Sequence, residues 1–282
     1  MLSAQEIKQV VKAALAEDVG SGDVTTLAIV PETARTRAIM VAREPLVVAG
    51  LALAEAAFHG ISTEVTAMRL AHDGQRLKKG QTLLRVAGET RAILSAERVA
   101  LNFVQRLSGI ATLTAQFVEA VHGTRAQILD TRKTTPGWRR LEKFAVTCGG
   151  GGNHRFGLHD MVLIKDNHLA VLRNEKPNPI AAAVWAARAE YPHLRIEVEC
   201  DTLEQVQQAI AAGADLILLD NMTVEQLRTA VKLVNGRRLT EASGGVTLET
   251  VRAIAETGVD FISVGALTHS ARAVDIALDF QG

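Results

Sequence analysis

Three similar segments near the C-terminus constrain the fold of this chain more than any other feature. They are DTLEQ (201–205), MTVEQ (222–226) and VTLET (246–250). Each follows an apolar run and begins a helical pattern, and two pairs have capping-box spacing: Asp201 with Glu204, and Thr223 with Gln226. The spacings of 21 and 24 residues between the segments indicate strands that alternate with helices. The sequence therefore predicts parallel βα units, arranged as a barrel or as an open doubly wound sheet.

Six apolar runs are strand candidates in this part of the chain. They are AQILDTR (126–132), DMVLIKD (160–166), RIEVEC (195–200), DLILLDN (215–221), RRLTEASGG (237–245) and DFISVGA (260–266). The residues at their C-terminal ends are Asp130 with Arg132, Lys165, Glu199, Asp220, Glu241 with Ser243, and Gly265. In a parallel barrel these ends share one face, where active sites form, so the pattern predicts a functional site. For any single strand, the alternative is that polarity simply resumes where the strand ends.

The first 110 residues predict a separate domain of antiparallel strands. Two runs, 36–50 and 63–88, are rich in strand formers, and DG and KKG within the second run are turn signals. Residues 73–88 slightly resemble the hairpin of carrier modules, but no lysine stands between small or acidic residues at the turn, which favours a structural hairpin. A helical pattern over 95–121 joins this domain to a barrel domain over 111–268. A last helix within 269–282 is expected to fold back onto the first domain.

Composition excludes several classes of protein. The chain has 282 residues and equal totals of 31 basic and 31 acidic residues, which argues against a nucleic-acid binder with a basic face. The sequence contains no apolar run long enough for a membrane span. Two cysteines, Cys148 and Cys200, are too few for a disulfide framework, and the N-terminus has acidic residues rather than the features of a signal peptide. We therefore expect a cytoplasmic protein with no membrane and no nucleic-acid partner.

Two carboxylates at neighbouring strand ends are candidate metal ligands. Glu199 and Asp220 offer hard oxygen atoms of the kind that Mg²⁺ prefers, and the alternative is an ion pair with a nearby lysine or arginine. The small residues of EASGG (241–245) and SVGALT (263–268) allow backbone N–H groups to approach a phosphate, although ordinary tight turns have the same composition. The four glycines 149–152 are consistent with a phosphate cradle or with a flexible lid.

A group of cations is the other candidate element of the site. It comprises Arg98, Arg132, Lys133, His154, Arg155 and Lys165. Such a group suits a ligand with two carboxylates, because guanidinium groups bind carboxylates in bidentate fashion. Arg139, Arg140 and Lys143 are expected to be solvated surface residues. The sequence has no serine-hydrolase triad order and no zinc-ligand spacing.

Long motifs resemble the quinolinate phosphoribosyltransferase family. They are EDVGSGDVTT (17–26), AREPLVVAGL (42–51), ERVALNFVQRLSGIAT (97–112), the block from DTRKTTPGWRR to LIKDNH (130–168), EVEC (197–200), LLDNM (218–222) and EASGG (241–245). The resemblance extends from end to end, and the block 130–168 is its most specific part. It implies an N-terminal α/β sandwich domain followed by an α/β barrel with fewer than eight strands.

The resemblance also implies a reaction and a set of site residues. Quinolinate and phosphoribosyl pyrophosphate would give nicotinate mononucleotide, pyrophosphate and CO₂, a step of NAD biosynthesis. The six cations above would surround carboxylates and phosphates, with Lys133 and Lys165 counted as catalytic together with Glu199 and Asp220, which would hold Mg²⁺. The 5′-phosphate would be bound by the small residues at two strand ends: Ser243, Gly244, Gly245, Gly265 and Ala266. The family forms dimers, and we expect Arg98 to enter the partner's site.

Two rival functions remain open from the sequence. The first is a related phosphoribosyltransferase that acts on nicotinate or another ring acid, including the paralogue associated with molybdenum transport. The second is a dimeric protein that binds a phosphorylated metabolite without catalysis. Product analysis with quinolinate distinguishes all three.

Overall fold

A computed structural model describes residues 2–281 of the chain, which divides into two compact units. Residues up to 115, 134–150 and 267 onward form the first unit, and residues 116–133 and 151–266 form the second. These boundaries differ from the expected ones at 110 and 268, because the segment 134–150 packs with the N-terminal residues although it lies between two strands of the second unit. Helix α4 (Thr90–Ala120) contributes residues to both units.

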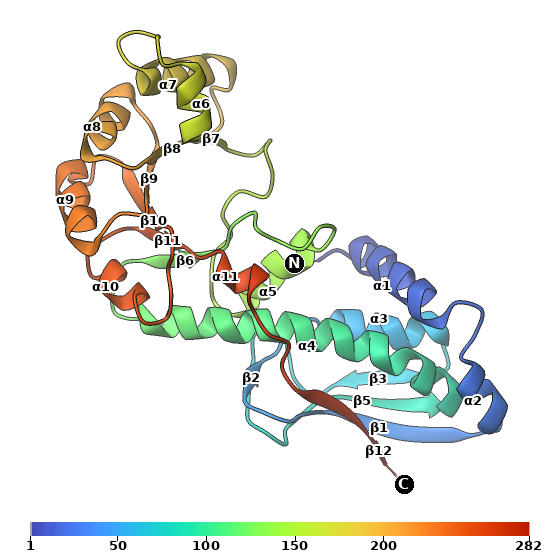
Figure 1. The fold of residues 1–282 in the computed structure, drawn as a ribbon. Helices are drawn as coiled ribbons and strands as arrows, with labels where there is room; N and C mark the ends of the chain where they lie inside the picture. The colour runs from blue at the N-terminus through green and yellow to red at the C-terminus, as the bar shows by residue number, and fades with distance from the viewer. Residues whose placement is uncertain (1, 282) are drawn as a thin grey trace. The chain divides into compact units, whose positions relative to one another are not determined.

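A four-stranded antiparallel sheet is the framework of the first unit (Figure 1). Its order is β12 (Ile276–Gln281), β1 (Arg35–Ala42), β5 (Thr82–Glu89) and β3 (Thr66–Arg69). The helix expected within 269–282 is wrong over most of that segment, since β12 pairs with β1 along its whole length. The reason is the side-chain period: Ile276 and Leu278 are buried while Ala277 and Asp279 are not, which is the alternation of a half-buried strand.

The expected hairpin at 73–88 is also wrong. Strand β4 (Arg76–Leu77) pairs with β2 (Leu46–Val47) in a separate two-stranded sheet, and β5 belongs to the four-stranded sheet. The turn residues therefore connect two sheets instead of two paired strands. The helices of this unit, besides its part of α4, are α1 (Ala4–Val19), α2 (Val24–Ile29), α3 (Leu51–Ile61), α5 (Arg139–Cys148) and all but the first residue of α11 (Ala266–His269).

The second unit is built on a parallel sheet of six strands, as the sequence predicts. Its order is β6 (Gln127–Leu129), β11 (Phe261–Ser263), β10 (Leu239–Ser243), β9 (Leu216–Asp220), β8 (Ile196–Cys200) and β7 (Val162–Ile164). The chain runs through α6 (Asp166–Val171), α7 (Pro179–Glu190), α8 (Leu203–Ala212), α9 (Val224–Val234) and α10 (Val251–Ala255) before reaching α11 (Ala266–His269). Because all the pairings are parallel, each of the six strands contributes its carboxyl end to one edge of this barrel-like sheet, whose end strands β6 and β7 are not paired with each other.

Local sequence explains why these elements begin and end where they do. Strand β9 is apolar and buried over Leu216–Leu219, as expected for a parallel strand covered on both faces, and it becomes polar at Asp220. Thr223 and Gln226 form the expected capping box of α9. Helix α8 begins one residue later than predicted, with the capping box between Thr202 and Gln205. The Thr202 hydroxyl accepts from the Gln205 backbone N–H, and the Gln205 side-chain amide oxygen accepts from the Thr202 backbone N–H. These two residues thus replace the predicted pair Asp201 and Glu204. In residues 2–281, no helix combines the length and the low polarity that a membrane span requires.

Candidate active site

A cavity of about 580 Å³ lies in the second unit, at the carboxyl ends of the parallel strands. Its lining is Thr131, Arg132, Lys133, His154, Arg155, Leu163, Lys165, Glu199, Leu218, Asp220, Asn221, Glu241, Ser243, Gly244, Gly245 and Ser263. Residues from all six strands or the loops that follow them are represented. The cavity is therefore at the edge of the sheet where the sequence predicted a site.

Ten of the predicted site residues line this cavity. They are Arg132, Lys133, His154, Arg155, Lys165, Glu199, Asp220, Ser243, Gly244 and Gly245. Gly265 and Ala266 follow β11 and are not among the lining residues, although Ser263 at the end of the same strand is. Arg98 is exposed on α4 in the first unit and is not part of the lining. The structure thus brings these ten residues together at one cavity, and their roles stay predictions.

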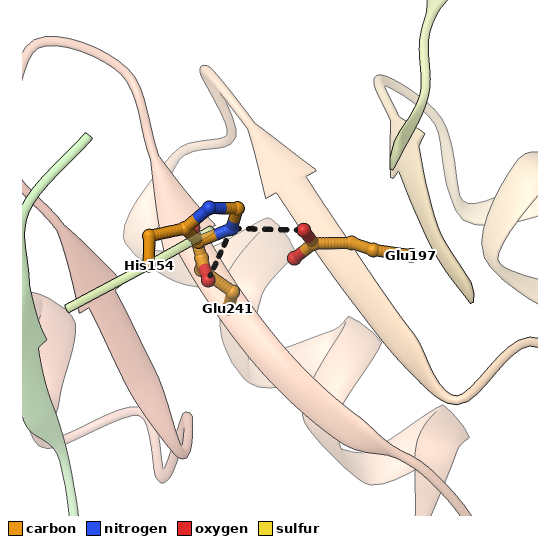
Figure 2. Close-up of side chains that lie close together, drawn as sticks. All are labelled: His154, Glu197 and Glu241. Atoms are coloured by element: carbon orange, nitrogen blue, oxygen red, sulfur yellow. Dashed lines mark hydrogen bonds and ion pairs between the residues drawn. The ribbon is translucent and has the colours of Figure 1, made fainter. Parts of the chain in front are cut away.

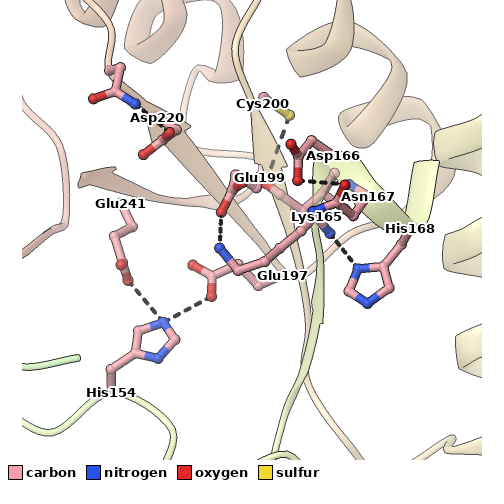
Figure 3. Close-up of polar contacts among 12 residues, drawn as sticks. His154, Lys165, Asp166, Asn167, His168, Glu197, Glu199, Cys200, Asp220 and Glu241 are labelled. Atoms are coloured by element: carbon pink, nitrogen blue, oxygen red, sulfur yellow. Dashed lines mark hydrogen bonds and ion pairs between the residues drawn. The ribbon is translucent and has the colours of Figure 1, made fainter. Parts of the chain in front are cut away.

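Lys165 and the two candidate metal ligands lie at three neighbouring strand ends (Figure 3). The Lys165 ammonium donates to the Glu199 carboxylate, so the ion pair that the sequence left as an alternative for Glu199 is present. Burial, and after it the negative charges of Glu199 and Asp201, raise the pKa of the Asp220 carboxyl. The mutual repulsion of Asp220 and Glu199 means that an added cation between them would be stabilised, which suits a divalent metal.

His154 forms a cluster with two buried glutamates (Figure 2): Glu197, which the sequence analysis did not assign to the site, and Glu241, which it named only as a strand-end residue. Its Nε2 lies 2.9 Å from Glu197 Oε2 and 3.5 Å from Glu241 Oε2. Glu197 is 0% exposed and Glu241 is 1% exposed. Burial, and after it the charge of Glu197, raise the pKa of Glu241 to about 8. A pattern signal for Glu197 exists, since it lies two residues before Glu199 and so faces the same side of β8.

Two arginines add positive charge to the same cavity. Arg155 Nη1 donates to the Met161 carbonyl at 3.2 Å, and burial followed by the charge of Arg132 lowers the pKa of Arg155. The Asp160 carboxylate stabilises the loop between Arg155 and Met161. It accepts hydrogen bonds from the backbone N–H groups of Phe156 and Gly157 at 2.6 and 2.9 Å. The loop therefore holds Arg155 close to a second cation, an arrangement that favours an anionic ligand.

The loops after β9 and β10 are joined by Asn221, which the sequence analysis missed. Asn221 has φ 52°, donates from Nδ2 to Asp220 Oδ2 at 2.6 Å, and donates from its backbone N–H to the Ser243 carbonyl at 3.0 Å. Gly244 has φ 96°, and a Cβ there would lie 2.1 Å from Asn221 Oδ1. Glycine is thus required at 244 both by its backbone conformation and by the closeness of Asn221. The sequence signals for Asn221 were its place directly after Asp220 and its inclusion in the motif LLDNM (218–222).

Two of the glycines at 149–152, Gly149 and Gly152, lie where the neighbouring chain packs too closely for a side chain. A Cβ on Gly149 would lie 2.4 Å from the Ala111 carbonyl oxygen, and one on Gly152 would lie 2.7 Å from Leu129 Cδ2. Gly152 also forms a parallel bridge with Leu129, beside β6. None of the four glycines lines the cavity. Close packing accounts for Gly149 and Gly152, and the alternatives of a phosphate cradle or a lid stay predictions for this segment.

Of the three basic residues expected to be solvated, Lys143 does not fit. It is 4% exposed, because α5 buries Leu141, Glu142 and Lys143 in succession, a wider face than a one-sided surface helix buries. Arg140 is more than half exposed and pairs with Glu6 at 2.8 Å. The expectation of a surface lysine at 143 is therefore wrong.

The cysteines are free thiols, in agreement with the absence of a disulfide framework in the sequence. Burial is the largest cause that raises the pKa of both Cys148 and Cys200 to about 12. At that pKa neither thiol is an activated nucleophile. The groups of the cavity that are available for binding and catalysis are therefore its cations, its carboxylates and the backbone of its glycine-containing loop.

Comparison with known proteins identifies the family. Residues 23–108 match the quinolinate phosphoribosyl transferase N-terminal domain, and residues 110–279 match the C-terminal domain. The probable carboxylating nicotinate-nucleotide pyrophosphorylase of Bacillus subtilis is 44% identical over 275 residues, which cover 97% of this chain and 93% of that protein. The Mycobacterium leprae carboxylating nicotinate-nucleotide pyrophosphorylase is 46% identical, with 96% of each chain covered. A solved structure of the nicotinate-nucleotide pyrophosphorylase from Francisella tularensis has a TM-score of 0.94 and 38% identity, and the match covers 100% of this chain and 98% of that one. The chain belongs to the quinolinate phosphoribosyltransferase family.

Proposed function

We propose that this chain transfers the phosphoribosyl group of phosphoribosyl pyrophosphate to quinolinate and removes one carboxyl group, giving nicotinate mononucleotide, pyrophosphate and CO₂ for NAD biosynthesis. Its family membership supports this reaction. The observation that carries the proposal is a single cavity that combines Arg132, Lys133, His154, Arg155 and Lys165 with carboxylates and a glycine-containing loop. Both substrates are polyanions, and such a lining binds their charges.

The glycosyl transfer requires positioning and charge stabilisation rather than a nucleophilic side chain. Pyrophosphate leaves the anomeric carbon of ribose while the ring nitrogen of quinolinate forms a bond to that carbon. Charge builds on the departing oxygens, so cations placed near them stabilise the transition state more than the ground state. Lys133 and Lys165 are the lysines that line the cavity.

Glu199 and Asp220 are proposed to hold Mg²⁺. The donor set fits, because two carboxylates at adjacent strand ends leave room for water and substrate oxygens around the ion, and because their repulsion is relieved by a cation. When bound, Mg²⁺ neutralises charge on the phosphate oxygens. Lys165 is paired with Glu199. If Mg²⁺ were held by that carboxylate, the ammonium of Lys165 would be free to bind a substrate anion.

Loss of CO₂ follows from the bond that the transfer forms. The ribosylated ring nitrogen is cationic, and it stabilises the carbanion left at the adjacent ring carbon when the carboxylate departs as CO₂. That carbanion then takes up a proton from water to give nicotinate mononucleotide. The loop at Ser243, Gly244 and Gly245 is proposed to bind the 5′-phosphate through backbone N–H groups. Gly265 and Ala266 are proposed to assist at the end of β11. Together these contacts hold the two reactants in place for both steps.

A homodimer is proposed to complete the site, with Arg98 of one chain entering the cavity of its partner. The support is the exposure of Arg98 on α4 and its absence from the lining of the cavity. The cytoplasm is the proposed location, since Cys148 and Cys200 are free thiols, which a reducing compartment preserves.

Discrimination between quinolinate and nicotinate tests the proposal. Nicotinate lacks the carboxylate beside the ring nitrogen and would leave a cation of the cavity without its partner. By analogy with truncation of one side of a buried charge pair, this costs about 2–5 kcal/mol, or roughly 30- to several-thousand-fold in kcat/KM. The measurement is kcat/KM for both acids at saturating phosphoribosyl pyrophosphate and Mg²⁺. Nicotinate turnover within about threefold of quinolinate, well below that penalty, would favour the rival phosphoribosyltransferase.

A further inference from the structure

The segment around Gly152 extends the parallel sheet of the second unit beyond β6. Gly152 forms a parallel bridge with Leu129 of that strand. The Gly152 N–H donates to the Ile128 carbonyl at 2.8 Å, and the Asp130 N–H donates to the Gly152 carbonyl at 3.2 Å. These two bonds are the repeating unit of a parallel ladder, so the chain that leads to His154 runs beside the end strand of the sheet.

At Asp130 a side chain takes the place of a backbone carbonyl in this ladder. Successive carbonyls of a strand face opposite edges: that of Ile128 accepts from Gly152, and that of Leu129 accepts on the β11 side. A continued ladder would therefore bring the His154 N–H to the Asp130 carbonyl. That N–H instead donates to the Asp130 side chain, with 2.9 Å between N and Oδ1. The Asp130 side chain therefore determines where the chain lies as it leaves the ladder.

Asp130 is placed to act through the backbone rather than on a ligand. It is 0% exposed and is not among the residues that line the cavity. His154, which donates the hydrogen bond, and Arg155, which follows it, both line the cavity. A buried carboxyl group is costly unless it is hydrogen-bonded, so packing alone does not explain one at the end of an apolar strand. The hydrogen bond from His154 supplies a reason.

His154 and Arg155 are held from both directions along the chain. Asp130 binds the backbone at His154, and Asp160 accepts from the two backbone N–H groups directly after Arg155. Residues 153–155 belong to no helix or strand, so no ladder fixes their backbone. Side-chain acceptors on either side fix it instead.

We propose that Asp130 is a positioning residue of the candidate active site. Its side-chain oxygen holds the His154 backbone and thereby sets the positions of the His154 and Arg155 side chains at the wall of the cavity. The proposal rests on the proposed function only in taking quinolinate as the ligand that these side chains contact. Loss of the acceptor should displace both side chains, and displacement of a binding group by about 1 Å costs up to roughly 100-fold in rate.

Nuclear magnetic resonance of ¹⁵N-histidine-labelled, ligand-free protein tests this role without a substrate. The His154 signals are identified among the eight histidines by their loss in His154→Gln. The His154 backbone amide should be protected from hydrogen exchange in the unaltered protein and in Asp130→Asn, which keeps an acceptor oxygen. Asp130→Leu removes both oxygens at a similar volume. It should lower the protection about 10-fold, the factor for one hydrogen bond, and shift the His154 ring signals.

Asp215→Leu is the matched control. The Asp215 side chain also accepts from a backbone N–H, that of Ile196 at 2.8 Å, but it lies at the amino edge of the same sheet. This variant should leave the amide exchange and the ring signals of His154 unchanged. An unprotected His154 amide in the unaltered protein, or His154 signals and exchange that are the same in Asp130→Leu as in the unaltered protein, overturns the proposal.

Steady-state kinetics tests whether the hydrogen bond matters for the ligand. Asp130→Leu should raise KM for quinolinate about 10- to 100-fold and change KM for phosphoribosyl pyrophosphate less than about threefold. Asp130→Asn should keep KM for quinolinate within about threefold of the unaltered value, because an acceptor oxygen remains. A chain that is merely destabilised has a smaller active fraction, which lowers kcat and leaves both KM values unchanged. A loss of kcat alone in Asp130→Leu therefore overturns the proposal.

A mutant cycle tests whether Asp130 acts through the two cavity residues. In a chain that already carries His154→Gln and Arg155→Gln, Asp130→Leu should add less than about threefold to KM for quinolinate, because the groups it positions are gone. Fully additive effects overturn the proposal. If Asp130→Leu does not fold, Asp130→Asn decides, and a KM for quinolinate raised about 10-fold or more despite the retained oxygen overturns it. If the His154 signals respond to Asp130→Leu as expected and the unaltered protein does not use quinolinate, the proposed function fails and the positioning role stands.

Discussion

Gly244 offers the sharpest prediction about how the cavity is built. Its left-handed φ of 96° disfavours any side chain, and a Cβ would lie 2.1 Å from Asn221 Oδ1 and 3.0 Å from the Asn221 backbone nitrogen. Alanine in the left-handed region costs about 1–2 kcal/mol, and overpacking adds about 1–3 kcal/mol. Gly244→Ala should therefore lower the free energy of unfolding by about 2–5 kcal/mol. It should also lower activity, because Asn221 supports Asp220 through a hydrogen bond of 2.6 Å.

Urea unfolding of four variants separates the two costs of that substitution: Gly244→Ala, Gly236→Ala, Asn221→Gly, and Gly244→Ala combined with Asn221→Gly. Gly236 has φ 69° and nothing within 4 Å of an added Cβ, so Gly236→Ala measures the backbone cost alone, about 1–2 kcal/mol. Asn221→Gly removes the two closest contacts of the Gly244 Cβ and fits the left-handed φ of 52°. In that background Gly244→Ala should cost less than in the unaltered chain but still more than Gly236→Ala, because the contact at 3.0 Å with the backbone nitrogen of residue 221 remains. If Gly244→Ala is no more destabilising than Gly236→Ala in the unaltered chain, the account of this loop is refuted.

Three further predictions concern the metal, the dimer and pH. Glu199→Gln and Asp220→Asn should each raise the Mg²⁺ concentration needed for half-maximal activity, and unchanged Mg²⁺ titrations with unchanged turnover would contradict the metal assignment. Inactive Arg98→Ala chains mixed with inactive Lys133→Ala chains should regain activity, since about half of randomly formed dimers are hybrids with one intact site; no recovery despite demonstrated subunit exchange would place Arg98 outside the partner's site. The pKa of Glu241 is about 8 in the folded state, against an ordinary 4.5, so folding favours the protonated form of this carboxyl group. Its contribution to the free energy of unfolding is therefore complete below pH 4.5 and is lost as the pH rises through 8. Glu241→Gln should flatten this dependence in unfolding experiments at pH 5, 7 and 9, and an equal slope in both proteins would show that Glu241 does not titrate as described.

Periodicity in the sequence predicted the second unit well, because each βα unit carries its own signals. The apolar run of β9 and the capping box of Thr223 and Gln226 are local features, and the parallel order of the strands brings their ends together. Prediction failed where pairing partners are distant in sequence. Strand β12 pairs with β1 across more than two hundred residues, and β4 pairs with β2 instead of with β5, which follows it. Turn residues and apolar content alone do not specify such partners.

In the candidate site, too, residues with a local sequence signal were predicted, and contacts between distant segments were missed. Lys165, Glu199 and Asp220 were found because they end strands, and their meeting at one edge follows from parallel topology. The link between Glu241 and His154 was missed because it depends on how the loop before β7 returns to the sheet. The close approach of Gly244 to Asn221 was missed for a similar reason, since it depends on two loops that follow different strands.

Product analysis with the proposed substrates tests the central claim most directly. Quinolinate labelled in the carboxyl group beside the ring nitrogen is incubated with phosphoribosyl pyrophosphate, Mg²⁺ and the full chain, and nicotinate mononucleotide, pyrophosphate and labelled CO₂ are quantified. The account predicts the three products in equal amounts, and their loss when phosphoribosyl pyrophosphate is omitted. Failure to release pyrophosphate, or release of pyrophosphate without labelled CO₂, would contradict the proposed reaction.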